Sequence, residues 1–133
     1  MDGQSNTDIV RFMYKSFAEG KVADVLACYD KDVVWERPGF PEIPFSGTYS
    51  GFDGMKKMLG IINETVNMIE FTPEKFLNDE NTVLVLGKDE AIVKLTGKRY
   101  YTNWVHYFTF KDKKITHVQV LIDTLAIAKA FQP

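Results

Sequence analysis

The sequence predicts a single α+β domain in which helices come first and an antiparallel sheet follows. Apolar residues recur at helical spacing in the first half of the chain, and from Asn67 onward they alternate with polar residues. The 133 residues match the usual size of one domain, without repeats, linkers or low-complexity segments. We therefore expect one domain over 1–133.

The composition excludes several classes of function. A net charge of −2 and a pI near 5.7 do not suit a surface that binds nucleic acid. The single cysteine, Cys28, cannot form an internal disulfide, and the N-terminus lacks the basic and apolar regions of a signal peptide. No apolar run is long enough to cross a membrane. We expect a cytoplasmic protein without nucleic-acid or membrane partners.

Three helices are expected in the first half. Asn6 or Thr7 can cap the first helix, which Gly20 ends. A second short helix begins at Val22, where apolar residues again recur at i, i+3, i+4 and i+7. The third covers 51–67 and carries an apolar stripe with the same spacing.

A strand over 33–37 separates the second and third helices. It ends at Pro38, because proline cannot donate a hydrogen bond to a sheet. The loop over 38–51 is rich in proline and glycine, yet it contains large apolar side chains that a fully solvated loop would not need. We therefore expect this loop to fold over the rim of a pocket.

The second half is predicted to form the sheet. The expected strands cover 68–77, 82–95, 99–110 and 115–122, and a short helix over 124–131 closes the chain. Pro73 must lie at a sheet edge or at a bulge. The strand over 82–95 is either one long strand with a bulge around 87–90 or two short strands.

The last two strands form a hairpin that contains both histidines. A two-residue turn at Asp112 and Lys113 would pair Phe110 with Ile115, Phe108 with His117, His106 with Gln119, and Trp104 with Leu121, all on the concave face. The outer face would then carry Val105, Tyr107, Val118, Val120 and Ile122. Such an apolar outer face predicts a homodimer through this surface. One residue more or less in the turn would reverse the face of the second strand.

Short motifs follow one another in a recognisable order along nearly the whole chain. They include Val34-Trp35-Glu36-Arg37-Pro38, Gly47-Thr48-Tyr49-Ser50-Gly51, Val85-Leu86-Gly87, Lys94-Leu95-Thr96-Gly97-Lys98 and Trp104-Val105-His106-Tyr107-Phe108. In order and spacing they resemble the SnoaL-like branch of the nuclear transport factor 2-like superfamily. The resemblance implies a cone-shaped, strongly curved antiparallel sheet wrapped around three N-terminal helices, an apolar pocket and a short C-terminal helix. Members include ketosteroid isomerase, polyketide cyclases, limonene epoxide hydrolase and non-catalytic binding domains, so the fold alone does not define the activity.

The resemblance implies three candidate catalytic residues. His106 aligns with the aspartic acid that ketosteroid isomerase keeps protonated as a hydrogen-bond donor. Asp123 matches an aspartate at the end of the last strand in cyclase and epoxide-hydrolase relatives. Glu36 lies near the carboxylate base of the isomerase, and whether Glu36 or Arg37 faces the pocket depends on a register that stays open here.

Each candidate also has a structural interpretation. His106 could be satisfied by Gln119, Asp123 could cap the last helix, and Glu36 could be an exposed rim residue. Asp123 lies roughly 13 Å along the strand from Gln119, so a direct pair with His106 is not expected.

Two departures from the enzyme relatives are visible. Counting back from Gly20 puts Met13 at the position of the helix-one tyrosine of the isomerase, with Tyr14 one residue away. The arginine and aspartate of the epoxide hydrolase should fall near 86–89, where the arginine is missing.

The expected ligand-binding residues are Trp35, Phe40, Phe45, Met13, Trp104, Phe108, Gln119 and Leu121. No metal is expected, because two histidines and one cysteine offer no ligand spacing. No cofactor is expected either, and phosphate-binding loops are missing.

Two functions stay open at this point. One is a cofactor-independent isomerase, cyclase or dehydratase that acts on a small apolar carbonyl compound, with His106 as donor and Asp123 or Glu36 as base. The other is a non-catalytic binding domain for an apolar metabolite, in which His106 and Gln119 orient the ligand. The inexact tyrosine position and the missing arginine favour the second.

Overall fold

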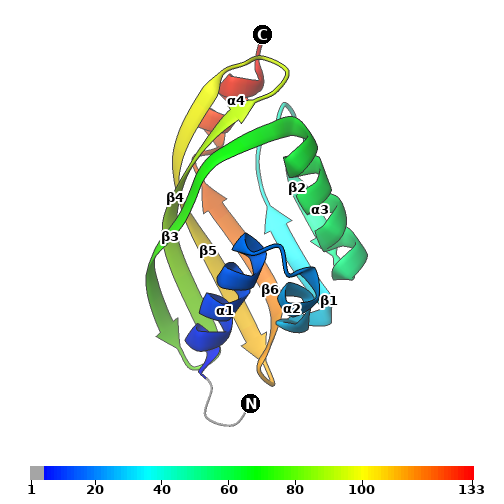
Figure 1. Cartoon of the computed structure of the whole chain (residues 1–133), viewed down its shortest axis with the longest axis vertical. Helices are drawn as coiled ribbons and strands as arrows, with labels where there is room; N and C mark the ends of the chain where they lie inside the picture. The colour runs from blue at the N-terminus through cyan, green and yellow to red at the C-terminus, as the bar shows by residue number, and fades with distance from the viewer. Residues whose placement is uncertain (1–4) are drawn as a thin grey trace.

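The structure is a computed structural model, and it describes residues 5–133. In chain order its elements are α1 (Asn6–Ala18), α2 (Val22–Ala27), β1 (Tyr29–Arg37), β2 (Gly47–Ser50), α3 (Gly51–Thr65), β3 (Val66–Asp79), β4 (Thr82–Val93), β5 (Arg99–Lys111), β6 (Lys114–Ile122) and α4 (Thr124–Phe131). The six strands form one curved sheet in the order β2-β1-β6-β5-β4-β3, antiparallel except for the parallel pair β1–β6. Figure 1 shows the sheet curving around α1, α2 and α3, which confirms the predicted α+β fold.

The N-cap of α1 is Ser5 and not the expected Asn6 or Thr7. The Ser5 hydroxyl accepts a hydrogen bond from the Asp8 amide at 3.0 Å, and the Asp8 carboxylate accepts one from the Ser5 amide at 3.3 Å. This reciprocal capping box satisfies amides that the first turn leaves without helical partners. The buried side of α1 carries Ile9, Val10, Met13 and Ser16.

The loop after β1 is more ordered than expected. It contains β2, which pairs antiparallel with β1, so that Trp35 lies opposite Tyr49 and Arg37 opposite Gly47. A strand of four residues with glycine at its start gives too short a pattern to be recognised by alternation. The loop buries Ile43 and Phe45 but leaves Phe40 exposed.

Edge strand β3 contains the irregularities that the sequence placed in β4. The β3–β4 register shifts between Met68 and Glu70 and again between Pro73 and Lys75, each time with one extra residue in β3. Pro73 therefore lies on an edge strand beside a bulge, as predicted. The bulge expected around 87–90 was wrong, because β4 pairs with β5 without a shift. Extra residues in the edge strand increase its twist and let it curve.

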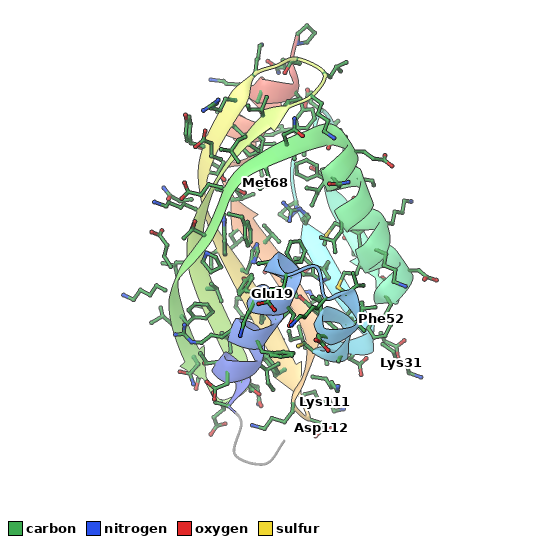
Figure 2. All side chains as sticks on the ribbon, viewed as in Figure 1. Glu19, Lys31, Phe52, Met68, Lys111 and Asp112 are labelled. Carbon is green, nitrogen blue, oxygen red and sulfur yellow. The ribbon has the colours of Figure 1, made fainter. Side chains whose placement is uncertain are left out.

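The β5–β6 hairpin starts in the predicted register and then leaves it. Asp112 and Lys113 both have positive φ, 51° and 65°, which identifies the predicted two-residue turn at the hairpin tip (Figure 2). Phe110 pairs with Ile115 as expected. Thr116 is then an extra residue in β6, so that Thr109 pairs with His117 and every later pair is displaced by one.

The displaced register reverses the predicted face of β6. His106 pairs with Val120 and Trp104 with Ile122, whereas Gln119 and Leu121 pair with outward residues of β5. Val118 and Val120 are 0% and 1% exposed, and Ile122 packs against the buried cores.

The predicted dimer surface changes with that register. Placing Val118, Val120 and Ile122 on the outer face was wrong, because the bulge turns all of them inward. Of the residues named for that surface, Val105 and Tyr107 do lie outside, half-buried and 39% exposed, respectively. Formation of a homodimer stays a prediction.

Gly87 of β4 allows the sheet to close tightly around Trp104. A Cβ atom at this position would collide with the Trp104 ring and would lie 2.6 Å from the Thr72 carbonyl oxygen of β3. Backbone and a buried ring leave no room for a methyl group, so the position requires glycine.

We predict that Gly87→Ala destabilises the protein by about 1–3 kcal/mol, the usual cost of overpacking a tight interior. Gly60→Ala is the matched control, because Gly60 lies within α3, where an added methyl group would meet no atom within 4 Å apart from its neighbours and the backbone of its own helix. That change should stabilise the protein by about 0.5–1 kcal/mol. Urea denaturation of both variants measures the difference, and equal unfolding midpoints would contradict the packing argument.

Candidate functional site

A largely apolar cavity of about 280 Å³ lies between the sheet and the helices. Its wall is built by α1, α3, the loop before β2 and the inner face of the sheet. The polar side chains that line it are Tyr14, Tyr29, Arg37, Asn63, Asp89, Tyr100 and His106. Most of the remaining lining is aromatic or aliphatic, including Met68 of β3, which Figure 2 labels.

The predicted ligand-binding residues divide between the cavity and other parts of the fold. Met13, Trp35, Phe45, Trp104 and His106 line the cavity. Phe108 is fully buried in the core, Phe40 is exposed on the loop, and Gln119 and Leu121 lie on the outer face of the sheet. The bulge at Thr116 accounts for the last two.

Tyr14 of α1 and His106 of β5 form a hydrogen-bonded pair inside the cavity wall. The Tyr14 Oη atom lies 2.7 Å from His106 Nδ1. The imidazole stacks on the Trp104 ring with centroids 4.1 Å apart. Counting back from Gly20 in the sequence had put Met13, and not Tyr14, at the position of the helix-one tyrosine of ketosteroid isomerase. Both residues reach the cavity, because adjacent helical positions are only about 100° apart around the axis.

Burial determines the protonation of this pair. Burial, with a further contribution from the charge of Arg37, lowers the pKa of His106 to about 3, so the imidazole is neutral at physiological pH. Burial also raises the pKa of Tyr14, which keeps its proton. A phenol is a good donor and an imidazole nitrogen a good acceptor, so we assign the hydrogen bond as Tyr14 Oη–H to Nδ1.

This assignment leaves the other imidazole proton on Nε2. Among residues 5–133, Nε2 has no hydrogen-bond partner, and it is not one of the polar atoms that the protein fully encloses. Since His106 lines the cavity, Nε2–H is the donor that the cavity receives.

A second polar group lies further along the same face of the sheet. Asp89 of β4 is 8% exposed, and its Oδ1 atom accepts a hydrogen bond from the Thr102 hydroxyl of β5. Burial raises the pKa of Asp89, although the Thr102 hydrogen bond and the charge of Arg37 oppose the shift. Tyr100 and Arg37 line the cavity as well. The arginine near Asp89 is thus Arg37, which comes from β1. The resemblance had led us to expect an arginine on the middle strand.

Glu36 and Asp123, the two predicted bases, lie elsewhere. Glu36 turns to the outer face, where its Oε2 atom lies 2.7 Å from His117 Nε2. The Asp123 Oδ1 atom accepts a hydrogen bond from the Ala126 amide at 3.1 Å, which caps α4. Neither residue lines the cavity. Among residues 5–133, Asp89 is the carboxylate that lines the cavity. The resemblance had placed the aspartate of the epoxide hydrolase near 86–89, but without its arginine Asp89 was not chosen as a candidate.

Metal and membrane features can be tested on the described residues. Within 5–133, no group of three or more His, Cys, Asp or Glu side chains is arranged to hold a metal ion. No helix in that part of the chain is long and apolar enough to span a membrane.

Comparison with known proteins assigns the fold and its class. An NTF2-like protein from Burkholderia xenovorans is 30% identical, with a TM-score of 0.87 over 96% of this chain and 95% of that one. TerC, crystallised with polyporic acid, is 25% identical, with a TM-score of 0.84 over 96% and 98% of the two chains. A candidate SnoaL-like polyketide cyclase from Mesorhizobium loti has 17% identity and a TM-score of 0.74, over 89% and 99%. No curated protein matches the sequence.

These likenesses define an NTF2-like α+β domain with a largely apolar internal cavity. The family model described as the SnoaL-like domain matches residues 10–118. The chain belongs to the SnoaL-like domain family.

The buried His106 should make stability depend on pH. Its pKa is about 3 in the folded state and 6.5 when unperturbed, so the unfolded chain binds more protons between these values. The stabilisation is therefore complete above pH 6.5 and is lost as the pH falls toward 3. From pH 7 to pH 5 the contribution of His106 should fall by about 2 kcal/mol.

Urea denaturation of the parent and of His106→Gln at both pH values measures this contribution. The parent should lose about 2 kcal/mol more than the variant. Equal losses in the two proteins would show that His106 titrates alike in the folded and unfolded states.

Asp123→Ala should destabilise the protein by about 1 kcal/mol through loss of the α4 cap. Asp123→Ser, which can still accept the hydrogen bond from the Ala126 amide, should retain most of the stability. Thermal unfolding of the two variants makes the comparison. A serine variant as unstable as the alanine variant would argue against capping as the role of Asp123.

Proposed function

We propose that the cavity binds a small apolar carbonyl compound and that the protein catalyses a cofactor-independent proton transfer on it, as an isomerase, cyclase or dehydratase does. The observation that carries the proposal is the neutral His106, fixed through Nδ1 by Tyr14 and directing Nε2–H at an apolar cavity. Such a donor is suited to a carbonyl oxygen that becomes negative during the reaction.

Tyr14 would act as a positioning residue. Its hydrogen bond to Nδ1 selects the Nε2–H tautomer and fixes the plane of the ring, which Trp104 supports by stacking. A preorganised donor in apolar surroundings stabilises developing charge more strongly than a donor in water.

Asp89 is our candidate for the base. It lines the cavity, its Oδ1 atom is held by Thr102, and Oδ2 has no hydrogen-bond partner among the described residues. Burial raises the pKa of Asp89, which makes its carboxylate a stronger proton acceptor than an exposed one. In this role it replaces Asp123 and Glu36, which do not line the cavity.

The TerC structure supports an organic ligand in such a fold. TerC shares 25% identity with this chain over nearly its whole length and was crystallised with polyporic acid. The M. loti protein, at 17% identity, supports the fold alone.

The alternative function is binding without catalysis, and the spacing of the polar groups favours it. Asp89 pairs with Thr102, four residues from His106 along β5, which corresponds to roughly 13 Å. Donor and carboxylate would then contact opposite ends of a bound compound and orient it. Proton transfer requires a compound that reaches both.

The two functions can be separated with 2-acetonaphthone, an apolar ketone with exchangeable methyl protons. The parent should accelerate exchange of these protons in deuterium oxide, measured by NMR. Asp89→Asn should slow the catalysed exchange by about 10²–10⁴-fold, the usual contribution of a general base. His106→Phe keeps an aromatic ring but removes the Nε2–H donor, and it should also slow the exchange. Glu36→Gln removes an equal charge outside the cavity and should have no effect.

Binding of the ketone without accelerated exchange would support the binding domain for this ligand. Exchange that persists in Asp89→Asn would show that another group is the base.

A further inference from the structure

Arg37 places a positive charge in the wall of the apolar cavity. It is the last residue of β1, where Glu36 turns outward and Arg37 inward, and it is partly buried. The Arg37 Cζ atom lies 5.2 Å from the centroid of the Phe45 ring, which supports the guanidinium on one side. The sequence left open which of these neighbours faces inward, and the pairing of β1 with β2 and β6 decides it.

The guanidinium has no polar partner in the described part of the protein. Among residues 5–133 it forms no hydrogen bond to a side chain or a carbonyl oxygen, and no ion pair. The other two arginines differ. Arg99 pairs with Glu90 at 2.6 Å, and Arg11 lies over the Phe76 ring at the protein surface.

Asp89 does not take the place of that partner. The negative charge of Asp89 raises the pKa of Arg37, but the two side chains form no ion pair. Asp89 accepts a hydrogen bond from Thr102 instead. Burial lowers the pKa of Arg37 from a value so high that the guanidinium stays charged at neutral pH. The cavity therefore contains a cation whose donors are free.

Burying a charged guanidinium in apolar surroundings costs free energy unless an anion pairs with it. The planar guanidinium matches the two oxygens of a carboxylate or of an enolised dicarbonyl compound, and such bidentate pairs are among the strongest polar contacts. Phe45 lies against the guanidinium, and Trp35 and Trp104 provide further apolar surface in the same cavity.

We propose that the natural ligand is an apolar organic acid whose ionised oxygens pair with Arg37. The inference rests on the proposed use of the cavity for a small molecule, and it does not require that the protein be an enzyme. An acid bound in this way has its charged end at Arg37 and its apolar body along the aromatic wall. Arg37 is thus a determinant of specificity for the ligand.

The test compares two probes that share one ring system, 2-naphthoate and 2-acetonaphthone, by titration calorimetry at pH 7.5. The parent should bind the acid more tightly than the ketone. Arg37→Met removes the charge and keeps a long apolar side chain, and it should weaken binding of 2-naphthoate by about 10–100-fold. Its affinity for the ketone should change less than about threefold, which also shows that the variant is folded. Arg37→Lys should retain part of the preference for the acid.

Arg11→Met is the matched control, because it removes one arginine charge outside the cavity. It should leave the binding of both probes unchanged. A parent that does not prefer the acid, including one that binds neither probe, would overturn the inference. An equal loss for both probes in Arg37→Met would also overturn it, since that pattern indicates a structural role.

The outcome is independent of the exchange experiment. A preference for the acid that depends on Arg37, without ketone exchange in any protein, supports the ligand class and rejects catalysis on that ketone. Exchange that depends on Asp89, without a preference for the acid, supports catalysis on the ketone and rejects the organic acid as the ligand class.

Discussion

The bulge at Thr116 is the local constraint on which the interior depends. By adding one residue to β6 after the hairpin turn, it directs Val118, Val120 and Ile122 inward against the helices. Without it, Gln119 and Leu121 would occupy those inward positions, and the side of β6 next to His106 would be polar. The bulge therefore keeps the core beside His106 apolar, and the low polarity in turn keeps His106 neutral.

The polar groups of the cavity follow from the same apolar environment. A wall of aromatic and aliphatic side chains makes ionisation costly, so Tyr14 and His106 satisfy one another as neutral groups and Asp89 is held by Thr102. Arg37 cannot lose its charge in this way, because the intrinsic pKa of a guanidinium is too high. The cavity thus has a neutral donor at His106 and, at Arg37, a cation without a polar partner among residues 5–133, and a ligand must match both.

Much of the fold could be predicted from local patterns. Helical spacing located α1, α2 and α3, alternation located the long strands, and Asp112 with Lys113 indicated the correct turn. The site was less predictable, because the face of the sheet on which a side chain lies depends on how its strand pairs. One bulge reversed the faces of β6, and the register of β1 decided whether Glu36 or Arg37 points inward. Asp89, Thr102 and Arg37 come from three strands and meet only in the folded sheet, so sequence spacing could not reveal them as one group.

Arg37 and Asp89 are coupled through charge. The positive charge of Arg37 favours the ionised form of Asp89 and thereby weakens it as a base. An anion paired with Arg37 would cancel this effect and add its own repulsion, so Asp89 would bind a proton more strongly when an acidic ligand is present. An organic acid would in this way increase the basicity of the carboxylate that contacts it. The same group that selects the ligand would then also prepare the proton acceptor.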